Sequence, residues 1–290
     1  MRAGVIGLGA MGAPMAANLA RAGRLEAVWN RTPERAEAFC REHGVPPAAD
    51  PEELARRCAL VLISVSADQD LDEVVGLLLP GLGRDNVVVD TSTVSANTAR
   101  RIAAAVEDTG ARFLDAPVSG GVEGARRGTL AMMVGGDAAA LERVRPLLEQ
   151  LARQLMHMGP VGAGQSTKAV NQIMAAGINQ AVTEALAFGR AEGLDLDRVI
   201  QAIGGGAAGN WFLEHRGAAM VRGSYEPGFR VALHYKDLAI CETMTARHGI
   251  TLPVIESTLS DYESLIAQGR GDEDISALYR LKRGLFGIDE

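Results

Sequence analysis

Apolar and polar residues alternate in blocks along the first half of the chain. The short apolar run at residues 3–6 precedes a helical pattern over Met15–Leu19, and the continuous apolar run Ala59–Val65 precedes another over Asp68–Leu79. Continuous apolar runs are typical of strands buried on both faces of a parallel sheet. Repeated strand–helix units build such a sheet with helices on both sides. The other expected strands are Leu25–Trp29, Asn86–Asp90, Arg112–Asp115, Leu130–Val134 and Gln154–Met158, and the other expected helices are Pro33–His43, Ser95–Asp108 and Ala138–Leu151.

The pattern changes at Val161, after which helical periodicity dominates. Residues 162–171 open a long helix that reaches about Glu192, a length of roughly 40 Å at about 1.5 Å per residue. We therefore predict an α/β fold class, with a doubly wound, mostly parallel sheet in residues 1–160 and an all-α domain in residues 161–290, joined by this helix. The shorter helices expected in the second domain are Asp195–Ile203, Asn210–Val221, Val231–His248, Leu252–Gln268 and Ile275–Phe286.

Two helix starts carry recognisable signals. Thr32 precedes Pro33, and Asp50 precedes a proline and is followed three residues later by Glu53. Proline suits the first helical position, and a threonine or aspartate before it can accept hydrogen bonds from the first turn. Both positions are therefore predicted N-caps.

Composition restricts the kinds of partner. Twenty-nine basic and 36 acidic residues give the 290-residue chain a net charge of −7, which argues against a nucleic-acid binder. No apolar run reaches membrane-spanning length, and the first strand begins so early that no signal peptide is expected. Cys40, Cys58 and Cys241 lack metal-ligand spacing and indicate reduced thiols. We expect a cytoplasmic protein without a bound metal.

The stretch from Val5 to Gly12 is the strongest local signal. It places Gly7, Gly9 and Gly12 as Gly-x-Gly-x-x-Gly between a strand and a helix. In dinucleotide-binding proteins the first glycine permits the turn, the second admits the pyrophosphate and the third brings the helix close to the strand. A glycine-rich turn can also bind nothing, but this position favours a nucleotide at the helix N-terminus. The predicted cofactor contacts in this loop are Gly7, Leu8, Gly9, Ala10, Met11 and Gly12.

The end of the second strand indicates which dinucleotide is bound. NAD-binding versions usually carry an acid there to hold the ribose 2′-hydroxyl, but this chain has Asn30, Arg31 and Thr32. A guanidinium can pair with a 2′-phosphate, and the neighbouring side chains can add neutral hydrogen bonds. We therefore predict NADP in preference to NAD.

Two later loops also leave strand ends. Val65 and Ser66 end one strand, and residues 90–93 end the next. In this architecture both loops border the nicotinamide half of the cofactor, so Val65, Ser66 and Thr93 are candidate contacts. Thr93 equally suits a helix cap, a role for which Ser95 competes.

The stretch from Asp115 to Gly121 has the composition of an anion site. Pro117 fixes the entering chain, Ser119 offers a hydroxyl, and Gly120 and Gly121 expose backbone N–H groups. A plain turn needs one glycine. We interpret Ser119, Gly120 and Gly121 as the binding site for a substrate carboxylate.

The long helix carries the candidate acid–base group. Lys168 and Asn171 are three residues apart and share a largely apolar helix face. Burial disfavours the charged form of a lysine and makes it a usable acid or base, although spacing alone favours a lysine that reaches solvent. Farther on, Trp211 fits either a substrate-pocket wall or ordinary core packing. Lys236 and Asp237 form a charged pair in an otherwise apolar helix, fitting either a surface face or a cofactor contact.

Taken together, these motifs resemble those of the β-hydroxyacid dehydrogenases, which include 3-hydroxyisobutyrate dehydrogenase, tartronate semialdehyde reductase and the glyoxylate/succinic semialdehyde reductases. The resemblance covers essentially the whole chain. It rests on four motifs in order: residues 7–12 with 15–19, Asp115 to Gly121, Gly162 to Asn171, and Lys236 to Leu238. Two positions depart from the usual family pattern. Gln172 stands where many members carry a second Asn, and Ser66 stands where a Pro is common.

The resemblance implies an N-terminal Rossmann domain, an all-helical C-terminal domain, an active site in the cleft between them, and a homodimer or homotetramer. It implies Lys168 as the acid–base group, Asn171 as the residue that orients the substrate, and Lys236 as a cofactor contact. We therefore expect an NADP-dependent oxidoreductase acting on the CH–OH group of a small carboxylated hydroxyacid, or on the corresponding aldehyde. The particular substrate stays open.

Two rivals share the scaffold. An imine reductase has the same architecture but typically lacks a lysine at position 168, and a non-catalytic NADP-binding or chromatin-reading relative would have lost it as well. This chain has the lysine, and it lacks the basic appended region that such a reader would carry.

Overall fold

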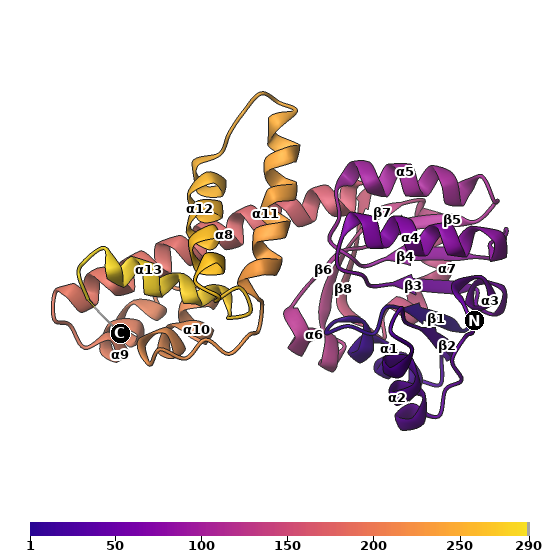
Figure 1. Cartoon of the computed structure of the whole chain (residues 1–290), viewed down its shortest axis with the longest axis horizontal. Coiled ribbons are helices and arrows are strands. Elements are labelled where there is room, and N and C mark those ends of the chain that lie inside the picture. Colours follow the sequence, from indigo (N-terminus) through magenta and orange to yellow (C-terminus); the bar gives the residue numbers. More distant parts are fainter. Residues whose placement is uncertain (289–290) are drawn as a thin grey trace. The chain divides into compact units, whose positions relative to one another are not determined.

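The computed structural model describes residues 1–288 of the chain and separates them into two units, Met1–Lys168 and the residues from Ala169 onward. An eight-stranded sheet forms the centre of the first unit, in the order β2-β1-β3-β4-β5-β7-β6 with β8 paired to β7 (Figure 1). The strands are β1 (Ala3–Ile6), β2 (Leu25–Trp29), β3 (Leu60–Ile63), β4 (Val87–Asp90), β5 (Arg112–Asp115), β6 (Val118–Ser119), β7 (Leu130–Gly136) and β8 (Ala152–Gly159).

Strands β1 to β5 are parallel, as predicted. Strand β7 runs antiparallel to both β5 and β6, and β8 runs parallel to β7. The chain moves from β1 to β2 on one side and then crosses to β3 on the other. In open α/β sheets the ligand crevice lies at such a switch point, at the carboxyl ends of the strands.

Helices cover both faces of the sheet (Figure 1). Successive strand residues point to opposite faces, so Val5 enters one core and Ile6 enters the other. The first core is completed by residues of α1 (Gly12–Arg21), α2 (Pro33–His43), α6 (Gly121–Arg127) and α7 (Ala138–Leu148), and the second by residues of α3 (Pro51–Arg57), α4 (Asp68–Leu78) and α5 (Ala96–Glu107).

One of the two predicted N-caps makes its capping hydrogen bond, and the other does not. Asp50 caps α3 by accepting a hydrogen bond from the Glu53 backbone N–H at 2.7 Å. Thr32 occupies the N-cap position of α2, but its side chain makes no capping hydrogen bond, so that part of the prediction is wrong. Pro33 still begins the helix as predicted, because its fixed φ suits the first turn.

The second unit is all-helical, as predicted. Helix α8 (Ala163–Ala191) runs through the boundary between the units and continues as the first helix of the second. Helices α11 and α12 lie side by side (Figure 1). The remaining bounds are α9 (Leu196–Gly204), α10 (Trp211–Val221), α11 (Val231–Ala246), α12 (Pro253–Ala267), a 3-10 turn at Ile275–Ala277, and α13 (Leu278–Gly284).

Two short elements were not predicted, namely β6 and α6. Both lie in the stretch that the sequence presented as an open, glycine-rich loop. A seven-residue helix with glycines at Gly121 and Gly124 lacks the apolar periodicity that reveals longer helices. Among the described residues, no helix combines the length and apolar character needed to cross a membrane.

Candidate active site

The carboxyl edge of the sheet gathers the loops singled out by the sequence. Strand register sets Ile6 opposite Ile63, Ile63 opposite Asp90, and Asp90 opposite Asp115. Four strands of the first unit therefore end level with one another. The loops that follow them leave the same edge, so the glycine loop, residues 64–66, residues 91–95 and residues 116–121 are neighbours at that edge.

The three glycines of the first loop have different reasons to lack a side chain. A Cβ on Gly7, whose φ is +90°, would lie 2.1 Å from the Ser64 carbonyl oxygen, and one on Gly12 would lie 1.8 Å from the Gly7 oxygen. A Cβ on Gly9 would have no protein atom within 4 Å. The fold itself therefore requires Gly7 and Gly12, whereas the space at Gly9 fits a ligand, in agreement with the pyrophosphate role of this position.

Asn30 and Arg31 are engaged within the first unit. The Asn30 side chain accepts a hydrogen bond from the Leu8 N–H at 2.9 Å and donates one to the Thr32 carbonyl at 2.9 Å, so it fixes the glycine loop to the end of β2. Arg31 is 72% exposed at its side chain and forms an ion pair with Asp70 of α4 at 2.8 Å. No carboxylate side chain belongs to residues 29–32, so the charged group at this strand end is a cation.

The loops after β3 and β4 are bonded to each other. The Val65 N–H donates to the Ser92 hydroxyl at 2.9 Å, which joins the two predicted nicotinamide loops. Ser95 accepts from the Thr98 N–H and caps α5, so the capping role does not fall to Thr93. Thr93 is half-buried at the same edge, and Ser66 is exposed.

Asp115 holds the start of helix α8. It is fully buried, and its two carboxylate oxygens accept hydrogen bonds from the backbone N–H groups of Gly162 at 2.8 Å and Gln165 at 2.9 Å. Burial raises the pKa of this carboxyl, although those N–H groups oppose the rise. Asp115 therefore joins the end of β5 to the start of α8.

Gln165 is a positioning residue that lies within the 162–171 motif, and the sequence gives no sign of its role. Its buried amide donates to the Ser92 carbonyl at 2.8 Å and accepts from the Val94 N–H at 3.3 Å. It therefore ties the first turns of α8 to the loop after β4. The two segments are 73 residues apart, and a glutamine near a helix start gives no signal of such a contact.

The substrate loop presents polar groups at its surface. Ser119 ends β6 and is half-buried, and Gly120 and Gly121 are exposed with φ of +126° and +63°. A positive φ of this kind is strained for residues with a Cβ. Both positions therefore favour glycine, and helix α6 begins at Gly121.

Lys168 approaches this loop from α8. Only 7% of it is exposed, and its ammonium donates a hydrogen bond to the Val118 carbonyl at 2.9 Å. Val118 is the residue before Ser119, so the amine lies against the segment that the sequence assigned to carboxylate binding. The surface-lysine alternative therefore does not describe Lys168, although sequence spacing alone had favoured it.

The candidates in the second unit form one hydrogen-bonded chain of side chains. The Asn171 amide donates to Gln172 at 2.8 Å, Gln172 donates to Asp237 at 2.7 Å, and Asp237 forms an ion pair with Lys236 at 2.9 Å. Gln172 and Asp237 are buried, while Asn171 and Lys236 are partly exposed at the two ends. Gln172 thus links the predicted substrate residue to the predicted cofactor residue.

Trp211 begins helix α10 and is 56% exposed, so core packing does not describe it. Its ring stacks on His215 with centroids 4.4 Å apart, and the Arg216 guanidinium lies 4.9 Å from the ring centroid. Arg216 is itself fixed by two hydrogen bonds to Asp274.

One compositional signal was missed in the sequence. The chain has three lysines, Lys168, Lys236 and Lys282, among its 29 basic residues. Lys282 is buried and bonded to Asp261 at 2.9 Å and Glu184 at 3.1 Å. Where arginine is the usual cation, a lysine marks a position that needs a compact ammonium or a proton that can leave. Two of these three positions are predicted site residues.

The described residues contain no group of three or more His, Cys, Asp or Glu side chains placed to hold a metal ion. The three cysteines are not in disulfides, and burial raises the pKa of the Cys58 thiol to about 12.

Comparison with known families assigns both units. Residues 2–159 match the model described as the NAD binding domain of 6-phosphogluconate dehydrogenase. Residues 162–282 match the model described as the NAD-binding domain of NADP-dependent 3-hydroxyisobutyrate dehydrogenase.

Similar proteins cover almost the whole chain. The chain is 38% identical to the 2-hydroxy-3-oxopropionate reductase of Escherichia coli, over 96% of each sequence. It is 35% identical to the NAD-dependent L-serine dehydrogenase of Pseudomonas aeruginosa, over 95% of this chain and 96% of that one. The structure of Mycobacterium tuberculosis 3-hydroxyisobutyrate dehydrogenase with L-serine superposes with a TM-score of 0.89 at 32% identity, over 98% and 100% of the two chains. The chain belongs to the β-hydroxyacid dehydrogenase family and is a nicotinamide-dependent oxidoreductase that acts on hydroxyacids.

Proposed function

We propose that this enzyme uses NADP to interconvert a small carboxylated aldehyde and its hydroxyacid, with Lys168 as the proton donor and acceptor. The observation that carries the proposal is the buried Lys168 ammonium, 2.9 Å from the backbone oxygen of Val118 and next to the Ser119–Gly121 loop. An acid–base group must lie within hydrogen-bond reach of the reacting oxygen. A carboxylate on this loop would bring the rest of a short substrate to the amine.

The nicotinamide, when bound, supplies or accepts the hydride. The residues that would hold the dinucleotide are those of the glycine loop, with the space at Gly9 for the pyrophosphate, and Val65, Ser66, Thr93 and Lys236. The Lys168 ammonium then gives a proton to the forming alkoxide in reduction, and its neutral amine takes that proton back in oxidation. Its hydrogen bond to the Val118 carbonyl fixes the nitrogen against the substrate loop.

Ser119, Gly120 and Gly121 are assigned to the substrate carboxylate. The serine hydroxyl and the exposed backbone N–H groups are donors that a carboxylate accepts. Asn171 orients the substrate hydroxyl, and its amide is held by Gln172 at 2.8 Å. The Trp211 ring would form one wall of the substrate pocket.

The preference for NADP over NAD rests on residues 30–32. The position that usually carries an acid has none, and the exposed Arg31 guanidinium is close to the end of β2. A 2′-phosphate carries more charge than Asp70 and accepts two parallel hydrogen bonds from a guanidinium. It is therefore a strong competitor for Arg31, whereas Asn30 remains with Leu8 and Thr32.

We also propose that residues 1–160 form the dinucleotide-binding domain and residues 161–290 a helical domain for substrate and oligomer contacts, with single residues of each domain reaching the other ligand. The two family matches, which end and begin at residues 159 and 162, support this boundary. A homodimer or homotetramer is the expected assembly. Light scattering of the purified protein measures it.

The decisive experiment is a kinetic screen. The purified enzyme is given succinic semialdehyde, glyoxylate, methylmalonate semialdehyde and tartronate semialdehyde, each with NADPH and with NADH, and cofactor oxidation is followed by absorbance. We expect turnover of at least one of these aldehydes, with a higher kcat/KM for NADPH. Reduction of cyclic imines with no turnover of any carboxylated aldehyde would refute the proposal.

A further inference from the structure

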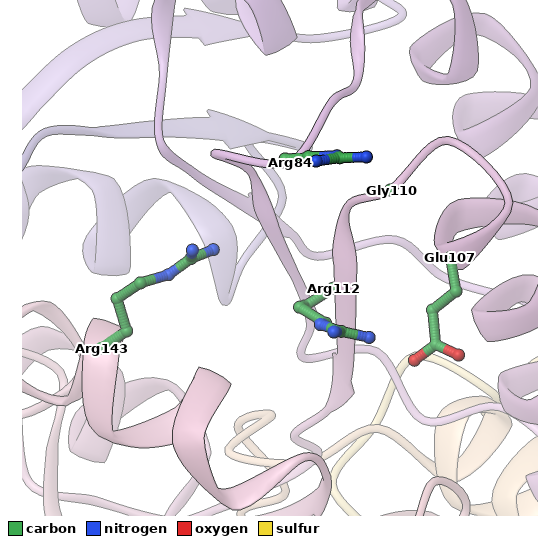
Figure 2. Close-up of a pocket in the computed structure, with 5 residues that line it drawn as sticks. All are labelled: Arg84, Glu107, Gly110, Arg112 and Arg143. Carbon is green, nitrogen blue, oxygen red and sulfur yellow. The ribbon is translucent and has the colours of Figure 1, made fainter.

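The first unit contains a second candidate site, at the edge of the sheet opposite the loops described above. A cavity of about 520 Å³ is lined by Arg84, Glu107, Gly110, Arg112 and Arg143 (Figure 2). Arg112 is the first residue of β5, whose last residue is Asp115. The cavity therefore lies where the strands begin and shares no residue with the predicted dinucleotide site.

The lining of this cavity has an excess of positive charge. Three arginines and one glutamate line it, and Figure 2 shows that these four charged side chains come from separate segments of the chain. Within residues 1–288, none of the three arginine side chains has an ion pair or hydrogen bond. Some other exposed arginines of this unit are paired, as Arg101 is with Asp72 at 2.9 Å. Like charges that share a cavity repel one another, and a bound anion removes that repulsion.

The backbone at Arg84 is fixed in place by a hydrogen-bonded turn beside the cavity. Its turn is closed by the buried Asn86, whose side chain accepts from the Gly83 N–H at 2.7 Å and donates to the carbonyls of Ala55 and Cys58. The Arg84 stem also crosses Gly110. A Cβ at Gly110, where φ is +88°, would lie 3.0 Å from Arg84 Cγ.

Arg112 is fixed in a similar way, because it is paired with Val87 in the sheet. Arg143 projects from helix α7. The backbone positions of all three guanidinium groups are therefore set by regular structure or by a closed turn. Binding an anion here requires ordering of side chains but no rearrangement of the fold.

We propose that this cavity binds a small phosphorylated metabolite that carries a hydroxyl or amino group. Arginine forks match phosphate oxygens in a two-point geometry, and three of them favour a group with more than one negative charge. Glu107 only accepts hydrogen bonds when ionised, so the ligand supplies a donor opposite it. The residues that line the cavity are at the surface, so a bound ligand would keep part of its surface in solvent. The inference does not depend on the proposed dehydrogenase substrate.

Glycerol 3-phosphate is a suitable probe, since it joins a phosphate to two hydroxyl groups. It is titrated calorimetrically into the enzyme saturated with NADP, so that the phosphate sites of the dinucleotide are already filled. Inorganic phosphate and glycerol are titrated separately. We expect one saturable glycerol 3-phosphate site per chain, with tighter binding than inorganic phosphate and with weaker binding as salt rises.

Variants locate the site. Arg112→Gln and Arg143→Gln should each weaken glycerol 3-phosphate binding about tenfold, the effect of one lost charge-assisted hydrogen bond. Glu107→Gln removes a negative charge, which should strengthen binding of both anions. It also removes the charged acceptor for the hydroxyl of glycerol 3-phosphate. The ratio of the glycerol 3-phosphate affinity to the inorganic phosphate affinity should therefore fall. Arg101→Gln is the matched control, an exposed arginine of the same unit, and should leave binding unchanged. Aldehyde reduction should stay at the wild-type rate in all four variants.

Three results would overturn the proposal: no saturable binding of either phosphate at millimolar concentration, the same affinity in the Arg112 and Arg143 variants as in the wild type, or an equal loss in Arg101→Gln. The last would indicate a general attraction of anions to surface arginines. Thermal unfolding of each variant shows whether it is folded, and Arg84→Gln replaces any variant that is not.

Discussion

The two units hold their candidate groups in different ways. In the first unit, backbone groups are the anchors. The Lys168 ammonium donates to the Val118 carbonyl, Asp115 accepts from two backbone N–H groups, and Asn30 accepts from the Leu8 N–H. A backbone group stays in place when the side chain of its residue is changed. These contacts therefore depend on the path of the backbone and not on the identity of the partner residue.

In the second unit, side chains are anchored on other side chains. Asn171, Gln172, Asp237 and Lys236 form a continuous series of contacts, and two of them are buried. Such a network requires a particular residue at every step, because a buried polar group that loses its partner is costly. In the first unit, substitution of the reactive side chain should thus reduce activity most. In the second unit, substitution of any member of the network should reduce it.

The largest effect is expected at Lys168. Lys168→Ala should lower kcat by about 10²–10⁴, the range for loss of a general acid–base group. Lys168→Arg should not restore the rate, because a guanidinium keeps its proton at any ordinary pH. Steady-state rates with saturating NADPH and aldehyde measure both.

Lys282→Arg is the matched control for this prediction. Lys282 is also buried but pairs with Asp261 and Glu184, so an arginine there should keep kcat near the wild-type value. A Lys168→Ala enzyme with a nearly normal kcat would remove Lys168 from the mechanism.

The next largest effect is expected from substitutions in the side-chain network of the second unit. Gln172→Leu removes the contacts to both Asn171 and Asp237 and should lower kcat/KM about 10- to 100-fold, mainly through KM. Asp237→Asn should raise the KM for the cofactor, because Lys236 loses its partner. If the two residues act together, the double variant should lose less than the product of the single losses.

Gln180→Leu separates positioning from stability. Gln180 is another buried glutamine of α8, bonded to Thr258 and Asp261. Its loss should lower the melting temperature and leave both KM values unchanged. Equal kinetic losses in Gln172→Leu and Gln180→Leu would mean that the network only stabilises the second unit.

The parts of the structure that could be predicted are those that local sequence controls. The strand–helix alternation follows apolar periodicity, and the need for Gly12 follows from its steric contact with Gly7 within one tight turn. Contacts between remote segments could not be predicted. Gln165 meets Ser92 across 73 residues, and Arg31 meets Asp70 across 39. The composition of the 162–171 motif suggested a site, but only the fold shows that Gln165 positions it and that Lys168 is buried.

Arg31 is the exception in the first unit, since it is anchored on a side chain. Arg31→Ala should raise the KM for NADP about tenfold while changing the KM for NAD little, because only NADP has a 2′-phosphate to lose a partner. Asp70→Asn should lower the KM for NADP, because it releases the Arg31 guanidinium from its carboxylate partner. Equal changes for the two cofactors would show that Arg31 does not contact the 2′-phosphate.

The smallest expected effect is the pH dependence of stability that arises from two buried aspartates, one in each unit. Although burial opposes ionisation of Asp274, hydrogen bonds and charge from Arg216 together with backbone N–H groups lower its pKa. Its stabilising contribution is therefore complete above the ordinary aspartate pKa of about 3.9 and is lost as pH falls through the lower folded-state value. The pH dependence of Asp115 has the opposite sign: burial raises its pKa, so its contribution is complete below the ordinary aspartate pKa and declines as pH rises through the higher folded-state value.

Urea unfolding of Asp274→Asn and Asp115→Asn beside the wild type, at several pH values from neutral to about 3, tests these two signs. The free-energy advantage of the wild type over Asp274→Asn should shrink below about pH 4. Its advantage over Asp115→Asn should grow as the solution is acidified from neutral toward the ordinary aspartate pKa. Each change is limited to about 1.4 kcal/mol per pH unit, because one proton is involved. Parallel pH profiles for the two variants would mean that the Arg216 side chain adds nothing to what backbone N–H groups already give a buried carboxylate.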